Sequence, residues 1–322
     1  MIPIVNDLLH LLFRHWHKLA LVSALGVWGV VLAFPSSGKQ VEIIFCNSGQ
    51  GDETLIQQGF RQILIDGSRP GRALGCLERH MPFFDRTIDV VAVTHPELDH
   101  FGGITDVVDR YQVMSFVYNG RAGTSQAWEQ LSKIIVDKNI PVQVVEAGDV
   151  IKAGEMRLDV IWPETLKDSP ELKGPTLSSQ GRTFSDSILG VSSSLPANQD
   201  GLVMVMSYSD FRALFTADIG EEEEREIIKL PGYQVNRLTG QQFNNFSVLK
   251  VPHHGSKFSS SQEFLEAVRP TLAVIEVGKN SYGHPAAEVV KRLEAVGAKV
   301  LRTDQGADVV VRTDGERWGI KK

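Results

Sequence analysis

The stretch VTHPELDHFGG places two histidines and two carboxylates within six residues, namely His95, Glu97, Asp99 and His100. Imidazole nitrogen and carboxylate oxygen together are the donors that zinc, manganese or iron take in hydrolytic centres. The preceding apolar run predicts a strand that ends at this turn. In an H-x-E-x-D-H turn, His95 and Glu97 can point to one side and Asp99 and His100 to the other. The turn is therefore predicted to serve two adjacent metal ions.

Three further segments bring the same residue types to the ends of predicted strands. LFTADIG carries Asp218, LKVPHHGSKFSSS carries His253 and His254, and NSYGHP carries His284. One such residue at a strand end is most often a turn or cap residue, but four strand ends of this kind together predict a metal site. Asp218, arriving from another strand, could bridge two ions. Two adjacent cations activate water and neutralise charge on a phosphoryl group.

The segment HHGSKFSSSQEF is predicted to bind phosphate. Ser260 with Glu263 predicts a capping box, so a helix is expected to begin there with its free N–H groups facing the preceding loop. His253, Ser256 and Lys257 stand just before it. One of the two adjacent histidines could ligate metal or act as a general acid, and the other could orient a ligand from behind. The sequence leaves these two roles open.

Strands and helices alternate from residue 41 onward. Strands are predicted in VEIIFC, RQILID and DVVAVTH, and a hairpin in GLVMVMSYSDFRALFTAD that turns at Ser209-Asp210. This order favours a layered α/β (α+β) domain over a helix bundle. The Ser-, Pro- and Gly-rich stretch Pro163–Asp200 is predicted to be a surface loop beside the site. Helices are predicted in GRALGCLERHM, GITDVVDRY, SQAWEQLSKIIVDKN, EEEEREIIKL, SQEFLEAV and AAEVVKRLEAV.

Composition narrows the class of protein. The net charge of −6 over 322 residues argues against a broad basic surface for nucleic acid but is compatible with a metal-centred phosphate site. The run Glu221–Glu224 is predicted to be a solvated first helical turn, where acids suit the helix dipole. Cys46 and Cys76 are expected to be buried small apolar residues, with one pairing as the alternative if the domain is exported.

The N-terminal segment differs from the rest of the chain. Leu19–Phe34 is a run of 16 uncharged residues, which as a helix spans about 24 Å, somewhat less than a hydrocarbon core of about 30 Å. Arg14 and Lys18 before it predict a cytoplasmic start and an exported remainder. The alternatives are a cleaved signal, with VLA at Val31–Ala33 as the cleavage site, and a buried soluble helix.

Five stretches, taken in order, resemble the metallo-β-lactamase superfamily, and more narrowly the metallo-β-lactamase-like domain of the ComEC family of DNA-internalization competence proteins. The pair GQGD and VPHHGS is more specific than the His-Asp turn alone. The resemblance extends over nearly all of Val41–Val311. The stretches are GQGDETLI (Gly49–Ile56), THPELDHFGG, LFTADIG, LKVPHHGSKFSS and GKNSYGHP (Gly278–Pro285).

This resemblance implies an αββα metallo-β-lactamase sandwich with the site at one edge of two sheets. With the composition, it divides the chain into an N-terminal membrane anchor or signal segment, 1–38, and a hydrolase domain, 39–322. It implies one or two divalent ions, zinc or manganese. Glu97 resembles the acidic residue that the family has in place of a histidine, which tilts selectivity toward manganese. The implied ligands are His95, Glu97, Asp99, His100, Asp218 and His284.

The chain departs from the family pattern in several places. No clear histidine stands between the first motif and Asp218, and Asn198 lies near the corresponding place. One metal position would contain His95 and Glu97, with Asn198 as a further candidate, and the other would contain Asp99, His100, Asp218 and His284. The first position is therefore expected to bind its metal ion more weakly than the second. TAD has Ala217 for the usual glycine. The family's polytopic channel domain is not part of this sequence, so the domain is expected either to work with a separately encoded DNA channel protein as a partner or to work on its own.

The sequence thus predicts an exported, metal-dependent phosphodiesterase or nuclease related to DNA uptake. It would be tethered by its N-terminal helix, with the domain on the outer face of the cytoplasmic membrane and DNA as substrate. Asp99 is expected to hold the attacking water, and His254 or His253 to protonate the leaving oxygen. One alternative is a metallohydrolase of a small ester, lactone or lactam, because a fold does not fix its substrate. The other is a catalytically silent DNA- or channel-binding module, supported by Glu97 and the missing histidine.

Overall fold

The computed structural model describes residues 39–163, 197–230 and 244–321. These residues belong to the second of the two units into which the chain divides, Lys39–Lys322. The predicted N-terminal hydrophobic helix and most of the predicted loop at Pro163–Asp200 lie outside the described residues. Within the described ranges, the structure contains no helix of the length and apolarity that a membrane crossing needs.

The first sheet has eight strands in the order β17-β16-β1-β2-β3-β5-β7-β8. Antiparallel pairing joins β17 through β3, and β3, β5, β7 and β8 are parallel to one another. Its strands are β1 (Val41–Phe45), β2 (Thr54–Gln58), β3 (Arg61–Ile65), β5 (Val90–Val93), β7 (Phe116–Tyr118), β8 (Val142–Val144), β16 (Val309–Thr313) and β17 (Trp318–Ile320).

The second sheet has seven strands in the order β15-β14-β13-β12-β11-β10-β9, and β4 (Thr87–Ile88) with β6 (Gln112–Val113) forms a separate short pair. The hairpin of β11 and β12 turns at residues 209–210, as predicted. The strands are β9 (Val150–Ala153), β10 (Met156–Trp162), β11 (Val203–Tyr208), β12 (Phe211–Phe215), β13 (Val248–Lys250), β14 (Leu272–Ile275) and β15 (Lys299–Arg302).

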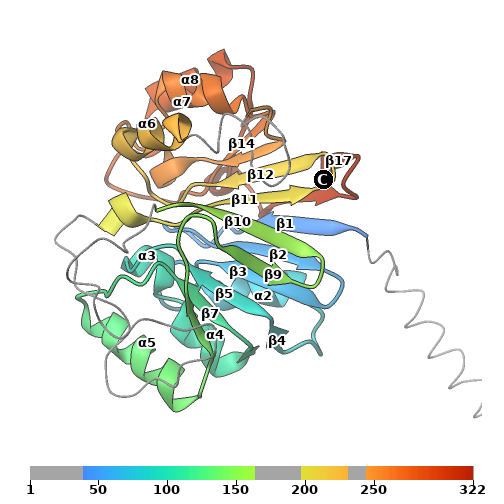
Figure 1. The fold of residues 1–322 in the computed structure, drawn as a ribbon, viewed down its shortest axis with the longest axis vertical. Coiled ribbons are helices and arrows are strands. Elements are labelled where there is room, and N and C mark those ends of the chain that lie inside the picture. Colours follow the sequence, from blue (N-terminus) through green and yellow to red (C-terminus); the bar gives the residue numbers. More distant parts are fainter. Residues whose placement is uncertain (1–38, 164–196, 231–243, 322) are drawn as a thin grey trace, which may run out of the picture. The chain divides into compact units, whose positions relative to one another are not determined.

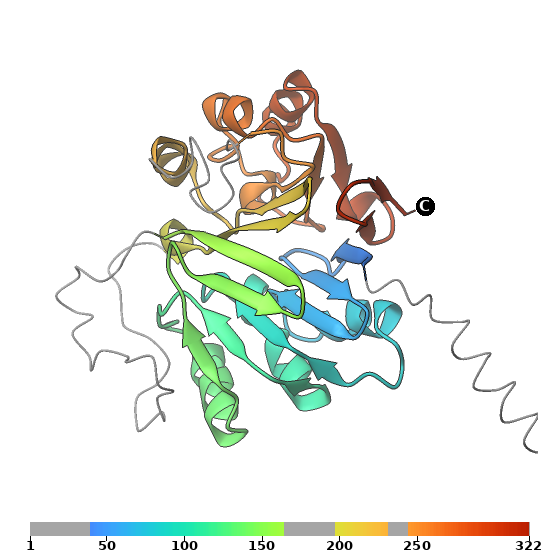
Figure 2. The ribbon, with the colours of Figure 1, turned by 45° about the vertical axis from the view of Figure 1, so that its right-hand side comes forward.

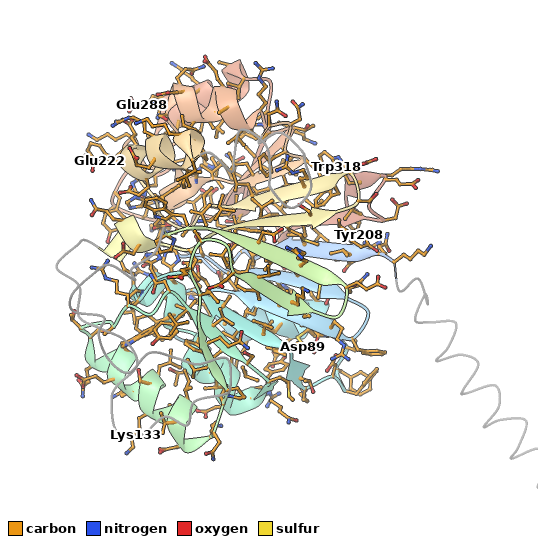
Figure 3. All side chains as sticks on the ribbon, viewed as in Figure 1. Asp89, Lys133, Tyr208, Glu222, Glu288 and Trp318 are labelled. Atoms are coloured by element: carbon orange, nitrogen blue, oxygen red, sulfur yellow. A yellow bond between two sulfur atoms is a disulfide. The ribbon has the colours of Figure 1, made fainter. Side chains whose placement is uncertain are left out.

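The two sheets face each other, and helices cover both outer faces (Figures 1 and 2). Apolar side chains from both sheets form the central core, while two further clusters join each sheet to its helices. Lys133, Glu222 and Glu288 mark the exposed helix faces (Figure 3). The predicted αββα sandwich is confirmed. The helices are α2 (Ala73–His80), α4 (Ile104–Arg110) and α5 (Gln126–Asp137) on the first sheet, and α6 (Glu221–Lys229), α7 (Gln262–Val268) and α8 (Ala287–Ala295) on the second.

Strand β1 shows why these residues build a layer with two buried faces. Val41, Ile43 and Phe45 enter the core between the sheets, and Ile44 and Cys46 enter the cluster under the helices. Successive side chains of a strand point to opposite faces, so a strand buried on both sides needs a continuous apolar run. The run IIFC, Ile43–Cys46, meets that need, and the charged Glu42 before it is only half-buried.

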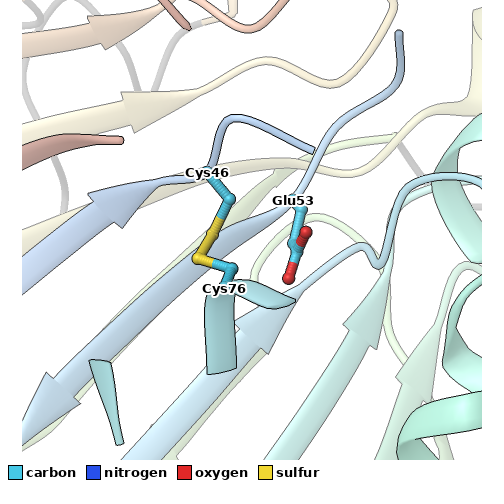
Figure 4. A group of neighbouring side chains, drawn as sticks. All are labelled: Cys46, Glu53 and Cys76. Atoms are coloured by element: carbon cyan, nitrogen blue, oxygen red, sulfur yellow. A yellow bond between two sulfur atoms is a disulfide. The ribbon is translucent and has the colours of Figure 1, made fainter. Parts of the chain in front are cut away.

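Cys46 and Cys76 form a disulfide that ties the end of β1 to α2, with their Cα atoms 5.9 Å apart (Figure 4). Both residues are buried, as expected. The pairing that the sequence left as the alternative is the observed state. The buried Glu53 lies beside the bridge. Burial, with the neighbouring Glu276, raises the pKa of the Glu53 carboxyl well above its usual range.

The prediction that Glu221–Glu224 is a solvated turn is wrong for its second half. Glu223 and Glu224 are buried. The Glu224 carboxylate accepts hydrogen bonds from the backbone N–H groups of Ser260 and Ser261, ahead of α7. Burial raises the pKa of Glu224 to about 7. Four identical residues in a row differ in burial because a helix turns successive side chains about 100° apart.

The predicted capping box is also wrong. The N-cap of α7 is Ser261, whose hydroxyl oxygen accepts from the N–H of Phe264 at 3.3 Å. Ser260 instead has a positive φ of 56° and precedes the cap. The Glu224 carboxylate therefore sits where the sequence placed a bound phosphate.

A candidate metal centre at one edge of the two sheets

Four loops that each follow a strand meet at one edge of the sandwich. They follow β3, β5, β12 and β13 and contain Asp66, the His95 turn, Asp218 and a short 3₁₀ segment, Pro252–Gly255. Parallel neighbouring strands end on the same side, so their following loops converge. This placement agrees with the sequence argument from strand ends.

His95 and His100 are both oriented by Asp66. His100 Nδ1 donates to Asp66 Oδ2 at 2.9 Å. The Thr94 hydroxyl donates to the same carboxylate at 2.7 Å and lies 3.0 Å from His95 Nδ1, from which it accepts. Both rings therefore carry their proton on Nδ1 and leave Nε2 bare, as ligating histidines do.

His254 follows the same pattern from the other sheet. Its Nδ1 donates to the backbone carbonyl of Glu276 at 2.9 Å and lies 3.2 Å from Asp52 Oδ1. A carbonyl oxygen only accepts, so this contact fixes the proton on Nδ1. The Nε2 atom then lies 3.5 Å from Asp218 Oδ2.

The bare nitrogens converge on Asp218. His100 Nε2 lies 3.3 Å from Asp218 Oδ2, and the ring centroids of His95 and His100 are 4.0 Å apart. The Nε2 atoms of His95, His100 and His254 and the Oδ1 atom of Asp218 are buried and have no hydrogen-bond partner among the described residues. Such atoms are costly to bury unless they share a cation. The donor set therefore fits a divalent ion.

Asp218 belongs to two overlapping donor groups. His95, His100 and Asp218 form one, and Asp52, Asp218 and His254 form another, with the ligand atoms of each group within 4.8 Å of one another. A shared carboxylate is what a pair of adjacent ions requires. Burial would raise the pKa of Asp218, but His254 and His100 hold it well below its usual range.

The His-Asp turn does not divide as predicted. His95 and His100 lie side by side, whereas Asp99 is 21% exposed, with Oδ2 3.8 Å from His254 Nε2 and 3.8 Å from Arg69. The short helix α3 (Leu98–Phe101) starts inside the motif, and helical geometry turns Asp99 away from His100. Asp99 consequently faces the opening of the site.

Glu97 stands before α3 and is half-buried. Burial raises the pKa of its carboxyl. It is in neither donor group among the residues that the structure describes. Asn198, on a 3₁₀ turn at Ala197–Asp200, has a buried side-chain oxygen without a hydrogen-bond partner in the described ranges.

His253 and His284 lie beside the donor groups. Their ring centroids are 5.7 Å apart, and His284 is 6.5 Å from His254 by the same measure. Both rings are half-buried. Asn280 holds the His284 loop by accepting from the His284 N–H at 3.1 Å. His284, predicted as a ligand, thus sits at the margin of the site.

The predicted phosphate-binding residues are separated by burial. The Ser256 side chain is buried, and the backbone N–H of Phe258 donates to its oxygen at 3.4 Å. Lys257 is exposed, with Nζ 4.9 Å from the Phe258 ring centroid. Lys257 is therefore the member of this segment that can reach a bound anion.

Sequence reasoning missed the ion pair of Lys250 and Asp52. Both are buried, and the ammonium contacts Asp52, lies 3.7 Å from Asp218 Oδ1 and donates to the Ala217 carbonyl at 2.9 Å. Burial would raise the pKa of Asp52, but Lys250 and His254 hold it at about 2. Both residues lie inside quoted motifs, GQGD and LKVPHHGS, where only glycines and histidines drew attention.

Asp66 was missed as well, although a signal existed. It ends the predicted strand RQILID, so the rule that selected the other strand ends applies to it. Burial would lower the pKa of His100, but Asp218 and Asp66 raise it well above its usual range. In the metal-free protein this negative field favours a second proton on the ring at Nε2, and a metal ion bound there would take the place of that proton.

Two glycines let the motifs pack directly on one another. A Cβ on Gly51 would lie 2.3 Å from the Asp99 carbonyl oxygen, and one on Gly103 would lie 2.2 Å from the Gly67 oxygen. Gly51 also has a φ of +133°. Asp52 N–H donates to the Asp99 carbonyl at 3.1 Å. The GQGD loop and the His-Asp turn therefore form one unit.

An αββα sandwich with histidines and aspartates at one edge defines a class of metal-dependent hydrolases. A sequence profile of the metallo-β-lactamase superfamily matches residues 54–278. The chain belongs to this superfamily. Among solved structures, it is similar to the metallo-β-lactamase fold protein YhfI from Bacillus subtilis, with a TM-score of 0.51 and 11% identity over 85% of this chain and 99% of that chain. At this identity the likeness shows the fold alone.

Two curated relatives are competence proteins. ComE operon protein 3 of Bacillus subtilis (strain 168) is 25% identical over 307 residues, which are 88% of this chain and 34% of that protein. Competence protein ComA of Neisseria gonorrhoeae is 52% identical over 92 residues, 28% of this chain and 12% of that protein. The chain spans about a third or less of these relatives. The resemblance to ComEC-family competence proteins is confirmed.

Proposed function

We propose that the chain is an exported, metal-dependent phosphodiesterase that cleaves DNA during DNA uptake. The observation that carries this proposal is the convergence of three bare imidazole nitrogens on Asp218. The competence relatives support the biological setting. The intact donor set argues against a catalytically silent module, because such a module has no need to keep it.

In this proposal His95, His100 and Asp218 hold one divalent ion, and Asp218 with His254 and Asp99 holds a second. Zinc and manganese both accept this mixture of nitrogen and oxygen. Ions bound there supply Lewis acidity that activates water and neutralises phosphate charge. The proposal also keeps the expectation that the position containing His95 binds its metal ion more weakly than the other position.

The side chains around these donors divide the proton transfers. Asp99 faces the opening and is placed to orient the attacking water and accept its proton. Because His254 Nε2 points into the donor group, His253 is the better candidate to hydrogen-bond the leaving oxygen, with His284 beside it. Lys250 stays charged and holds Asp52 and Asp218 ionised. Nucleophile and leaving group are thus served from different elements.

The rim of the site supports a nucleic-acid substrate. Phe258 is 68% exposed and Tyr282 is 67% exposed, on the two segments that carry His254 and His284. Exposed aromatic rings beside a cation bind single-stranded nucleic acid by stacking on its bases. Lys257 supplies that cation next to Phe258.

Export is supported by the buried disulfide, because disulfides persist in oxidising compartments. We propose 1–38 as a membrane anchor or signal segment and 39–322 as the hydrolase domain on the outer face of the cytoplasmic membrane. A DNA channel would then receive the uncut strand. Flotation of the full chain with vesicles tests the anchor.

The function itself is tested with metal-stripped protein refilled with manganese or zinc. End-labelled single- and double-stranded DNA is offered to the wild type and to Asp99→Ala, with a lactam as the competing substrate. Metal-dependent cleavage of DNA that Asp99→Ala abolishes is the expected result. Bound metal without cleavage by either ion would contradict the proposal and favour a small ester as substrate.

A further inference from the structure

Three exposed phenylalanines gather far from the metal site. Phe60 is 57% exposed, Phe83 is 84% and Phe84 is 50%. The ring centroids of Phe60 and Phe84 are 6.0 Å apart, and those of Phe83 and Phe84 are 5.3 Å apart with an edge-to-face geometry. The cluster combines the turn between β2 and β3 with the loop after α2. We call it the aromatic end.

The aromatic end is the opposite end of the strands that carry the metal site. Strand β3 starts at Arg61, next to Phe60, and its parallel neighbour β5 starts at Val90, after the Phe83 loop. Both strands lead to Asp66 and His95. A strand of five residues spans about 17 Å. The two surfaces therefore face away from each other along the strands.

The chain enters the domain at the same end. The Tyr208 hydroxyl donates to the backbone carbonyl of Lys39 at 2.8 Å, and the Gln58 amide lies 3.3 Å from the same hydroxyl. Gln58 is two residues before Phe60. Tyr208 and Asp89 mark this end in Figure 3. The connection to residues 1–38 thus starts beside the aromatic end.

Basic side chains accompany the phenylalanines. Lys39, Arg61, Arg86 and Lys152 are exposed. Acidic side chains stand among them: Asp89 pairs with Arg61 at 2.7 Å, and the exposed Glu155 lies 3.5 Å from the Gln58 amide. A hollow of about 430 Å³ next to the turn has Arg61 and Lys152 in its lining, along with Thr87 and Met114. Aromatic rings with neighbouring cations are typical of surfaces that enter the headgroup region of anionic membranes.

We propose that the aromatic end rests on the lipid bilayer, with Phe60, Phe83 and Phe84 at the boundary of headgroups and acyl chains. This inference rests on the proposed membrane tether. The uncharged run in the sequence ends at Phe34, and the five residue steps from Phe34 to Lys39 span at most about 18 Å. A bilayer that holds that run must lie close to the aromatic end. The metal site then faces away from the lipid, toward arriving DNA.

The test is the depth of a spin label on the full chain in vesicles of phosphatidylcholine with about one third phosphatidylglycerol. The native cysteines are paired, so Phe83→Cys provides a single labelling site. Phe258→Cys, an exposed phenylalanine at the metal end, is the matched control. Flotation of the vesicles is measured in parallel.

The expected result is that oxygen relaxes the label at position 83 several-fold more than a water-soluble nickel chelate does, with the reverse at position 258. A chain that floats with an aqueous label at position 83 overturns this inference and leaves the tether intact. A chain that does not float overturns both. Immobilisation at 83 that needs no lipid and rises with protein concentration would assign the surface to a second copy. DNA cleavage is measured independently of all these outcomes.

Discussion

The two ends of the central strands use charge in opposite ways. At the metal end, Lys250 and Asp52 are both buried, and the surrounding groups have strongly shifted pKa values. At the aromatic end, Arg61 pairs with Asp89 while 62% of its side chain is exposed. A buried charge is tolerated only where other charges or an ion compensate it, whereas an exposed pair contributes little. This difference in burial of charge distinguishes the metal end, which we propose to be catalytic, from the aromatic end, which we propose to be a contact surface.

The largest effect is expected from Asp218→Asn, with Asp89→Asn as the control at the aromatic end. Asp218 is shared by both donor groups, so its loss removes charge from each. Bound metal and DNA cleavage should fall at least about 100-fold in Asp218→Asn and stay near the wild type in Asp89→Asn. Metal analysis and initial rates measure this. An equal loss of bound metal and of cleavage in the two variants would contradict the proposed difference between the metal end and the aromatic end.

The second effect concerns stability. Lys250→Met leaves Asp52 and Asp218 buried without their ammonium, and should lower the free energy of unfolding of the metal-free protein by about 3–5 kcal/mol. Arg61→Met breaks the exposed pair with Asp89 and should cost less than about 1 kcal/mol. Urea unfolding of both variants gives the comparison. Similar losses in the two variants would show that burial does not determine how much each ion pair contributes to the free energy of unfolding.

The third effect concerns substrate. Phe258→Ala should raise KM for single-stranded DNA about 10-fold with kcat little changed, because a stacking contact acts in binding. Phe60→Ala, which removes an exposed ring from the aromatic end, should leave KM as it is. Steady-state kinetics on a short single strand measures both. An unchanged KM in Phe258→Ala would remove the rim from the proposed binding surface.

The smallest effect concerns Ala217, which has a φ of +48°. The ComEC family, which this chain resembles, usually has glycine at this position. Ala217→Gly should raise the free energy of unfolding by about 0.5 kcal/mol, since glycine adopts this conformation without steric cost. Ala153→Gly, in strand β9, should lower it by about 1 kcal/mol. Thermal unfolding compares them. A loss of stability in Ala217→Gly would mean that the alanine methyl group has a packing role.

The fold and the main donors could be predicted because both follow local rules. Apolar runs that end in His or Asp predicted His95, His100 and Asp218 as donors and left His254 open as a donor or a general acid, and the same rule applied to RQILID would have given Asp66. The order of the motifs along the chain predicted the αββα sandwich. Each of these signals is contained within a few consecutive residues, so it can be recognised in a single sequence.

The remaining features depend on contacts between distant parts of the chain. The pairing of Lys250 with Asp52 and the contact of Glu224 with Ser260 each join separate elements. Nothing in the run of four glutamates distinguishes the two that become buried. The capping box failed because the S-x-x-E spacing favours Ser260, whereas in the structure the Glu224 carboxylate binds the N–H groups of Ser260 and Ser261 and the Ser261 side chain caps α7.

The pairing of β1 with β16 has a consequence for the order of assembly. Val41 pairs with Thr313, so the first strand of the sheet receives its second neighbour from the last part of the domain. Until that strand arrives, β1 keeps an open edge, and the loop that leads from it to Asp52 lacks its final support. Contacts this distant form slowly. We therefore expect the Asp52 part of the metal cluster to be completed late in folding, so that a partly folded domain lacks the complete site.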